Sequence, residues 1–335
     1  MIGALEKVHS LEEYKHKKFN LKSFSASNFS RKDILDLSYQ ILYKFSINYL
    51  SVSSIWLFEN KFYDWVFRYI AGVKMPTNLN MIRGKVLEEY LLKKSKNYDD
   101  LTKLKEDAIK DFETEIKEAS REELGDIKLV CTEEEIEEAK NFILNTLHIN
   151  FEFFKEREFY NHSTSIMYQG NFSIPIYGVI DSFVKISGKN GETSGIVELK
   201  TTERIPKEPS ESHIRQLGLY MVACKDDLRH KDDSNLGYIY YVGSSKYMKK
   251  GSVRMRVFVF KREEIENYIV SYFENTVYKM AKFLLHFDKK EDLIDIAIPQ
   301  YTSFMFDKNY RDLYGKVFNF SIDKPIPSAS YEMFV

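Results

Sequence analysis

Two stretches of sequence decide the fold of this chain, and they are SIPIYGVIDSFVKI (173–186) and SGIVELKTTE (194–203). Apolar and polar residues alternate along both stretches, which is the pattern of a β-strand. Between them lies SGKNGE (187–192), whose Asn190-Gly191 dipeptide favours a tight turn. The sequence therefore predicts that the two strands form a hairpin.

Three charged residues of this hairpin are placed to meet. Side chains alternate between the two faces of a strand, so Glu198 and Lys200 share one face while Leu199 points the other way, into the core. On the first strand, Asp181 shares a largely apolar face with its neighbours two positions away. An acid there costs several kcal/mol unless it is paired or binds a metal. Two carboxylates and one ammonium can therefore converge on a single point.

Such a set of residues is compatible with two functions. Paired carboxylates can hold divalent ions, which lower the pKa of an attacking water and neutralise charge on a phosphodiester as it is cleaved. A nearby lysine can orient that water or stabilise the transition state. Hard oxygen ligands favour Mg²⁺ or Mn²⁺ over zinc. Alternatively, the same residues form a buried ion pair that only fixes the register of the strands, and the hairpin alone does not exclude this.

A helix is predicted directly after the hairpin, over SHIRQLGLYMVACKDD (212–227). His213, Gln216 and Tyr220 lie on one face of it, among apolar neighbours, so this face is expected to look into a site. For His213 two interpretations stay open, because it can be a core or surface histidine or a contact to phosphate.

Two glycines mark places where chain segments are expected to approach closely. Gly178 lies three residues before Asp181 on the first strand. Gly84 lies on a helix that is predicted to start near Asn78, and Glu88 follows it by one turn on the same helix. Glu88 therefore lies one turn beyond a position of close approach.

Periodicity and turn signals predict the remaining elements. Helices are expected at 31–48, 53–70 (with Ser51 or Ser53 as N-cap) and 261–287, and strands at 152–160, 237–245 and 252–262. Residues 95–145 are highly charged and predict one or two solvated helices, as a cap or an insertion. The tail 297–335 is irregular and rich in Tyr and Phe. This order predicts an α/β domain with a mixed central sheet and helices on both faces.

The composition sets limits on the class of protein. The 335 residues are 44% hydrophobic and carry a net charge of −1, so a nucleic acid would bind a local basic patch rather than the whole surface. Only Cys131 and Cys224 are present, which excludes a disulfide scaffold and any four-cysteine metal site. Neither a membrane-spanning run nor a secretory signal is evident, so a cytoplasmic setting without membrane contact is expected.

Four short motifs occur in an order that resembles one nuclease family. The motifs are GKVLE (84–88), GVID (178–181), ELK (198–200) and QLGLY (216–220). They resemble the RecB-like branch of the PD-(D/E)XK nuclease superfamily, in which Gly-x-x-x-His, Gly-x-x-Asp, Glu/Asp-x-Lys and Gln-x-x-x-Tyr motifs follow one another. The resemblance runs from about Ser51 to Phe287.

The resemblance implies a restriction-endonuclease-like fold, a mixed central sheet flanked by helices. Residues 1–50 would be an N-terminal helical extension and residues 51–335 the nuclease domain, with the charged insertion inside it. Asp181, Glu198 and the backbone carbonyl of Leu199 would bind Mg²⁺ or Mn²⁺.

The resemblance also implies roles for the residues around these ligands. Glu88 would supply the third carboxylate, and Lys200 would orient water or stabilise the transition state. Gln216 and Tyr220 would position the scissile phosphate or the Lys200 side chain. Contacts to nucleic acid are expected from four further residues: Thr201, Thr202, His213 and Arg215.

The chain departs from the family pattern in two ways. Glu88 stands where the family has histidine, which shifts the metal preference toward Mg²⁺. Many RecB-like members, including the CRISPR-associated adaptation nucleases, hold an iron–sulfur cluster, but Lys61 occupies the first cysteine position and no cysteine follows Cys224. No iron–sulfur cluster is expected. Aromatic packing of the C-terminal tail against the first helices is expected in its place, through Tyr310, Tyr314, Phe318 and Phe320.

The expected activity is that of a DNA exonuclease, or of a DNase directed to ends or single strands. A structure-specific or RNA-directed endonuclease is the alternative within enzymes. A noncatalytic DNA-binding subunit that keeps the fold is the alternative from another class. No helicase motif is present, so coupling to a motor would need a helicase, recombination or defence protein as partner.

Overall fold

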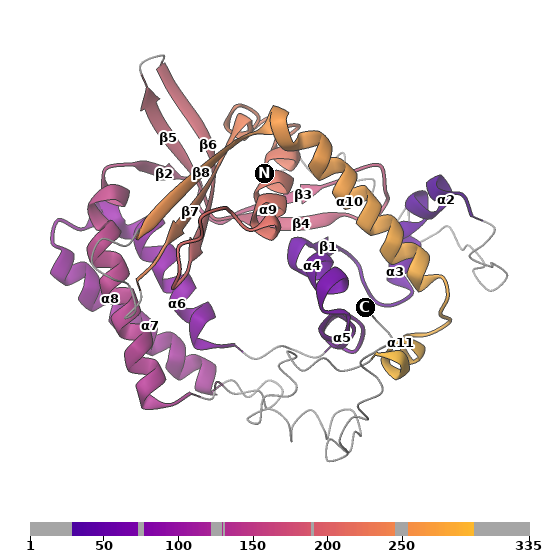
Figure 1. Ribbon diagram of the computed structural model, residues 1–335, viewed down its shortest axis with the longest axis horizontal. Helices are drawn as coiled ribbons and strands as arrows, with labels where there is room; N and C mark the ends of the chain where they lie inside the picture. The colour runs from indigo at the N-terminus through magenta and orange to yellow at the C-terminus, as the bar shows by residue number, and fades with distance from the viewer. Residues whose placement is uncertain are drawn as a thin grey trace.

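The computed structural model is an α/β protein with two mixed sheets and helices on both sides of the larger one (Figure 1). It describes residues 29–72, 77–121, 129, 131–188, 191–244 and 254–297. The predicted fold class, a restriction-endonuclease-like mixed sheet flanked by helices, is confirmed. Within these ranges, no helix combines the length and apolar character that crossing a membrane requires.

The larger sheet has five strands in the order β2-β5-β6-β7-β8. Its strands are β2 (Glu158–Tyr160), β5 (Ser182–Gly188), β6 (Gly191–Thr201), β7 (Leu236–Val242) and β8 (Met255–Lys261). β6 pairs with β7 in parallel, and all other neighbours are antiparallel. The pairing of β5 with β6 confirms the predicted hairpin, although Asn190 in its turn lies outside the described residues.

The smaller sheet shows that one predicted strand is in fact two. Its order is β1-β4-β3, with β1 (Leu50–Ser51), β4 (Ile176–Ile180) and β3 (Thr164–Tyr168). The single strand expected over 173–186 is wrong, because β4 and β5 belong to different sheets and Asp181 lies between them. Ile180 and Phe183 are both fully buried, so the side-chain alternation breaks at this acid. β3 had not been predicted.

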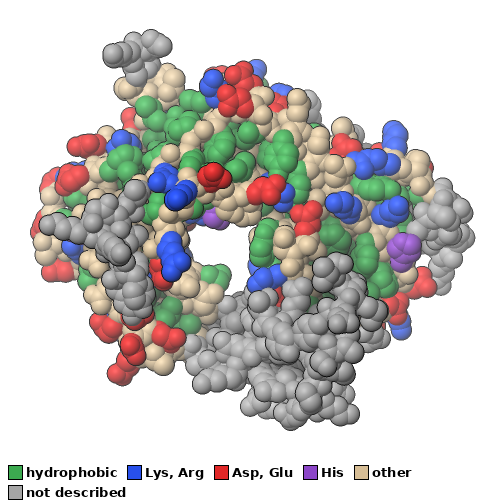
Figure 2. Space-filling view, viewed as in Figure 1, with side chains coloured by type: hydrophobic (Ala, Val, Ile, Leu, Met, Phe, Trp, Pro, Cys, Tyr) green, Lys and Arg blue, Asp and Glu red, His purple; other side chains and the backbone are tan. Residues whose placement is uncertain are grey.

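The helices form two groups, one on each face of the larger sheet (Figure 1). One group contains α6 (Leu79–Glu88), the π-helix η4 (Glu89–Lys94), η5 (Ser95–Asn97), α7 (Leu101–Arg121) and α8 (Glu133–Lys155). The other contains α2 (Arg31–Asp36), α3 (Ser38–Tyr43), α4 (Val52–Asn60), α5 (Phe62–Trp65), the π-helix η3 (Val66–Ile70), α9 (Glu211–Cys224), η6 (Asp232–Asn235), α10 (Arg262–Leu284) and α11 (Lys290–Ile296). Figure 2 shows the surface hollowed between the two groups, with side chains of both charges around the hollow.

Two hydrophobic cores lie on opposite faces of the sheet, and β6 contributes to both. Ile196 belongs to the core with α9 and α10, whereas Val197 and Leu199 belong to the core with α6, α7 and α8. This follows from the alternation of side chains along a strand. Leu199 therefore points into the core as predicted, and Glu198 and Lys200 share the face of Ile196, which α9 covers.

Several element boundaries differ from the sequence-based expectation. The helix expected at 31–48 is two short helices, and the one at 53–70 is interrupted at Lys61 and ends as a π-helix. The predicted cap at Ser51 is confirmed, since its hydroxyl accepts a hydrogen bond from the amide of Ser54 at 3.1 Å.

The strand expected at 152–160 begins as helix. α8 continues through Lys155, and only the last three residues pair as β2. Leu147, Phe151 and Phe154 are all buried at helical spacing, and this stripe outweighs the local alternation.

The charged stretch 95–145 also contributes buried residues to the hydrophobic core. Leu104, Ala108 and Phe112 form a fully buried stripe on α7 that packs into the core beneath α6 and α8. Charged residues cover only the outer side of this layer. The aromatic packing expected from the tail beyond Ala297 lies outside the described residues.

Candidate active site

A chain of hydrogen bonds joins β6 to α9. The ammonium of Lys200 donates to Glu198 Oε1 and, at 3.1 Å, to Gln216 Oε1. The amide nitrogen of Gln216 then donates to the hydroxyl of Tyr220 at 2.8 Å. Gln216 and Tyr220 are four residues apart on α9, so one helical face holds both against the strand. The four residues predicted to act together are thus connected, and the geometry fixes where the Lys200 ammonium points.

Asp181 occupies the junction between the two sheets. Its Oδ2 accepts a hydrogen bond of 2.8 Å from the backbone N–H of Leu199, and its own carbonyl accepts one from Ser163. The first bond holds the junction against β6, and the second holds it against the residue that precedes β3. Burial raises the pKa of Asp181, while the charge of Lys200 and the Leu199 amide oppose that rise.

Glu198 is the most deeply buried acid of the site. Its side chain is 1% exposed, and Oε2 has no hydrogen-bond partner, although Oε1 is paired with Lys200. Burial raises the pKa of Glu198 to about 8 despite this pair. Burial also acts to lower the pKa of Lys200, but the charges of Glu198 and Asp181 outweigh it and raise that pKa. The ammonium therefore stays charged at neutral pH.

Glu88 ends α6 close to these acids. Burial and the nearby charge of Asp181 raise the pKa of Glu88 to about 7. Lys93, which sequence reasoning missed, lies 3.8 Å from Glu88 and 3.0 Å from Glu89. Lys93 is five residues after Glu88, and the wider π-helical turn of η4 brings the two together. In an α-helix, a spacing of four residues would bring Lys93 to Glu89 but not to Glu88.

The donor set fits a divalent cation in part. Within the described ranges, no group of three or more His, Cys, Asp or Glu side chains is gathered closely enough to hold a metal ion. The site does contain a fully buried carboxylate oxygen without a partner, on Glu198, next to a second carboxylate whose pKa is raised. A cation between Glu198 and Asp181 would satisfy that oxygen and offset the repulsion between the acids.

The residues expected to contact nucleic acid fall in different places. The hydroxyl of Thr202 donates to the backbone carbonyl of Arg204 at 2.9 Å in a local turn, and Arg215 forms an ion pair with Glu211. Arg215 also stacks on Tyr272, away from the acids. The structure therefore does not bring Arg215 together with the carboxylates of Asp181 and Glu198.

Thr201 and His213 lie nearer to the site. Thr201 Oγ1 is 3.4 Å from the position that a Cβ on Gly84 would take, so α6 meets the end of β6 there. His213 Nδ1 is 2.6 Å from the hydroxyl of Tyr241, and burial with the charge of Lys200 lowers its pKa to about 4. His213 is therefore neutral at pH 7.

The family model of the PD-(D/E)XK nuclease superfamily matches residues 49–291, which span all of these site residues. The chain belongs to the PD-(D/E)XK nuclease superfamily. The chain matches no curated protein in the comparison. One solved structure, described as "Crystal structure of SSO0001", is 15% identical, and the match covers 65% of this chain and 84% of that chain with a TM-score of 0.25. A superposition this loose decides nothing further about the chain.

The nuclease has an open cleft beside Lys200, with a volume of about 840 Å³. Gln216, Tyr220 and His213 line one side of it, and the start of α4 lines another. Sequence reasoning missed the aromatic residues of this cleft: Tyr49, Trp56 and Tyr177. Tyr49 precedes α4, Trp56 lies on α4 and Tyr177 lies on β4, so only the pairing of β1 with β4 brings the two segments together.

Gly178→Ala should destabilise the nuclease by about 1–3 kcal/mol and weaken its activity. A Cβ at this position would lie 2.5 Å from the ring of Tyr220, so the ring must move and its bond to Gln216 is disturbed. Urea unfolding measures the loss. Gly84→Ala is the matched control, because its Cβ would meet only Thr201, at 3.4 Å. A Gly178→Ala protein as stable as wild type would contradict the close packing inferred here.

Proposed function

We propose that this chain is a divalent-metal-dependent DNA nuclease of the RecB-like branch, acting on ends or single strands. The observation that carries the proposal is the connected set of Glu198, Lys200, Gln216 and Tyr220, with Asp181 bonded to the same strand. A register-fixing ion pair needs only Glu198 and Lys200. It gives no reason for Gln216 and Tyr220 to extend the network on α9.

Asp181, Glu198 and the carbonyl of Leu199 would hold Mg²⁺ or Mn²⁺, with Glu88 as a further carboxylate. The bound ion would supply an activated water and charge neutralisation at the phosphate. Lys200 places a fixed positive charge in the lining of the cleft, where it can orient the attacking water or stabilise charge that develops on the phosphate.

The residues behind Lys200 keep that charge in position. Gln216 accepts from the ammonium, and Tyr220 accepts from Gln216, so neither side chain needs to touch the substrate to matter. Preorganisation of this kind lowers the barrier because the charge does not have to be reoriented during the reaction.

The decisive experiment is incubation with linear duplex, circular and single-stranded DNA, and with RNA, each with Mg²⁺ or Mn²⁺. Loss of linear and single-stranded DNA with circular DNA intact is the expected result. Cleavage of circular DNA would instead identify an endonuclease, and cleavage of RNA alone an RNA-directed enzyme. Binding of DNA without cleavage of any substrate would identify a noncatalytic subunit.

Mg²⁺ should raise the melting temperature of the wild-type protein by a few degrees. A ligand at one hundred times its Kd stabilises the folded state by about 2.7 kcal/mol. Differential scanning fluorimetry with Mg²⁺, against NaCl at equal ionic strength, measures the shift. Asp181→Asn should remove most of it, because one of two buried anionic ligands is lost. An equal shift in the variant would place the metal elsewhere.

A further inference from the structure

Two exposed tyrosines stand between the cleft beside Lys200 and a second cavity. Tyr49 is 56% exposed and Tyr177 is 41% exposed, and their rings meet edge to face with centroids 5.3 Å apart. Both residues line the cleft, and both also line a cavity of about 1000 Å³. The cleft and the cavity therefore adjoin at the tyrosine pair.

Strand pairing creates this aromatic pair. Ser51 of β1 lies opposite Tyr177 of β4, and Tyr49 precedes Ser51 by two residues, so the tyrosines are diagonal neighbours on one face. Tyr177 precedes Asp181 by four residues. At about 3.3 Å per strand residue, β4 leads from the pair to the acid over roughly 13 Å.

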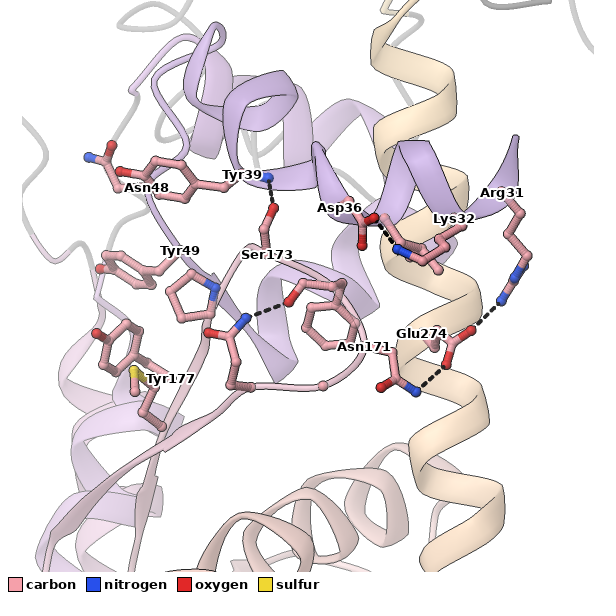
Figure 3. Close-up of a pocket in the computed structure, with 16 residues that line it drawn as sticks. Arg31, Lys32, Asp36, Tyr39, Asn48, Tyr49, Asn171, Ser173, Tyr177 and Glu274 are labelled. Atoms are coloured by element: carbon pink, nitrogen blue, oxygen red, sulfur yellow. Dashed lines mark hydrogen bonds and ion pairs between the residues drawn. The ribbon is translucent and has the colours of Figure 1, made fainter. Parts of the chain in front are cut away.

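The second cavity suits an uncharged, planar group. Arg31 forms an ion pair with Glu274 at 3.1 Å, and Lys32 forms one with Asp36, so its charged residues neutralise one another. Figure 3 shows the tyrosine pair across the cavity from Arg31 and Glu274. The rest of the lining includes aromatic rings and side-chain amides: Tyr39, Asn48, Gln169, Asn171 and Phe172. Such a lining can stack on a nucleobase and bond to its edge, and each cation among the described residues of the lining is already paired with a carboxylate.

We propose that this surface binds single-stranded DNA, with unpaired bases stacked on Tyr49 and Tyr177 and one base entering the second cavity. The inference rests on the proposed nuclease function, because the strand continues from the tyrosines into the cleft at Lys200. Aromatic side chains bind unpaired bases of any sequence by stacking on their faces. A base inside a duplex is already stacked and paired, so an intact duplex cannot use this surface.

Tyr49→Ala and Tyr177→Ala test the stacking directly. Each should weaken binding of a fluorescently labelled single-stranded oligodeoxynucleotide about tenfold, measured by anisotropy in EDTA, because one stacked base contributes about 1.4 kcal/mol. Binding of a blunt duplex should change less than twofold. Tyr49→Phe and Tyr177→Phe keep the ring and should bind as wild type does. Tyr43→Ala is the matched control, since Tyr43 is 50% exposed and lines neither the cleft nor the second cavity.

The wild-type protein provides a second test that needs no variant. DNA stacked at about 3.4 Å per nucleotide covers the 13 Å from Asp181 to the tyrosines with about four nucleotides. Duplexes with single-stranded overhangs of zero to eight nucleotides should therefore bind more tightly once the overhang passes about four. Affinity that does not depend on overhang length, or an equal loss for single-stranded and blunt DNA in the alanine variants, overturns the proposal.

These results are distinguishable from a failure of the nuclease function itself. The binding measurements contain no metal and do not depend on cleavage. If Asp181→Asn abolishes cleavage while the tyrosine variants bind single strands normally, the nuclease function stands and the stacking surface is refuted. If no DNA is cleaved but the tyrosine variants lose single-strand binding, the surface stands and the catalytic proposal is refuted.

Discussion

Replacing Asp181 with asparagine should lower the rate of DNA cleavage by about a thousandfold or more while the fold is retained. Residues that act as one catalytic unit lose several orders of magnitude when any essential member is removed. Asparagine keeps the shape of the side chain, and its oxygen can still accept the hydrogen bond from Leu199 that now measures 2.8 Å. The variant therefore removes a negative charge without breaking the junction between β4 and β5.

The same variant should be as stable as wild type, or more stable, in the absence of metal. Burial raises the pKa of Asp181, and a group with a raised folded pKa contributes stability only at low pH and loses it as the pH rises. Ionisation of this carboxylate therefore costs more in the folded protein than in the unfolded chain, and the neutral amide avoids that cost. Thermal melts in EDTA measure this. The exposed Asp226, changed to Asn, serves as control and should alter neither activity nor stability.

A Lys200→Met variant should also lose cleavage by about a thousandfold, but for a different reason. Methionine fills similar space without the charge that the proposed mechanism places at the phosphate. Because both carboxylates remain, the rise in melting temperature with Mg²⁺ should persist in this variant. Loss of that rise together with loss of activity would instead show that Lys200 supports metal binding and does not act on the reacting groups.

The free energy of unfolding separates these two variants. At about pH 9, above the pKa of about 8 of Glu198, removing the ammonium leaves this carboxylate, which is 1% exposed, without its ion-pair partner, and this should destabilise the metal-free protein by up to about 3 kcal/mol. Adding Glu198→Gln to Lys200→Met removes the unpaired charge and should restore most of the stability without restoring activity. Urea unfolding of the single and double variants at about pH 9 gives the comparison. A double variant no more stable than the single one would contradict a buried, ionised pair.

The local parts of the candidate site could be read from the sequence because they depend on short-range periodicity. Alternation along β6 puts Glu198 and Lys200 on one face whatever surrounds the strand, and helical spacing places Gln216 and Tyr220 together on α9. The close approach expected at Gly178 also holds, since the ring of Tyr220 fills the space beside it.

The elements that sequence reasoning misplaced are those whose boundaries depend on distant partners. α8 continues to Lys155 because Phe151 and Phe154 enter a core shared with α6 and α7, which no local window reveals. The strand that was expected to be continuous divides at Asp181 because its two halves pair with different strands. Lys93 approaches Glu88 through a π-helical turn, and the spacing of the two residues in the sequence does not predict such a turn.

By itself, the sequence of this protein predicted the residues that are proposed to carry the chemistry. It also determined that Glu198 and Lys200 share one strand face and that Gln216 and Tyr220 share one helix face, because the geometry of a strand or a helix is set locally. Only the tertiary structure decided how those faces are brought together. The pairing of β1 with β4 sets Tyr49 beside Tyr177, and the break between the two sheets turns Asp181 toward Leu199. The first contact joins segments that are more than a hundred residues apart in the sequence, and the second joins residues that are nearly twenty apart. Burial of the two separate cores selects both contacts.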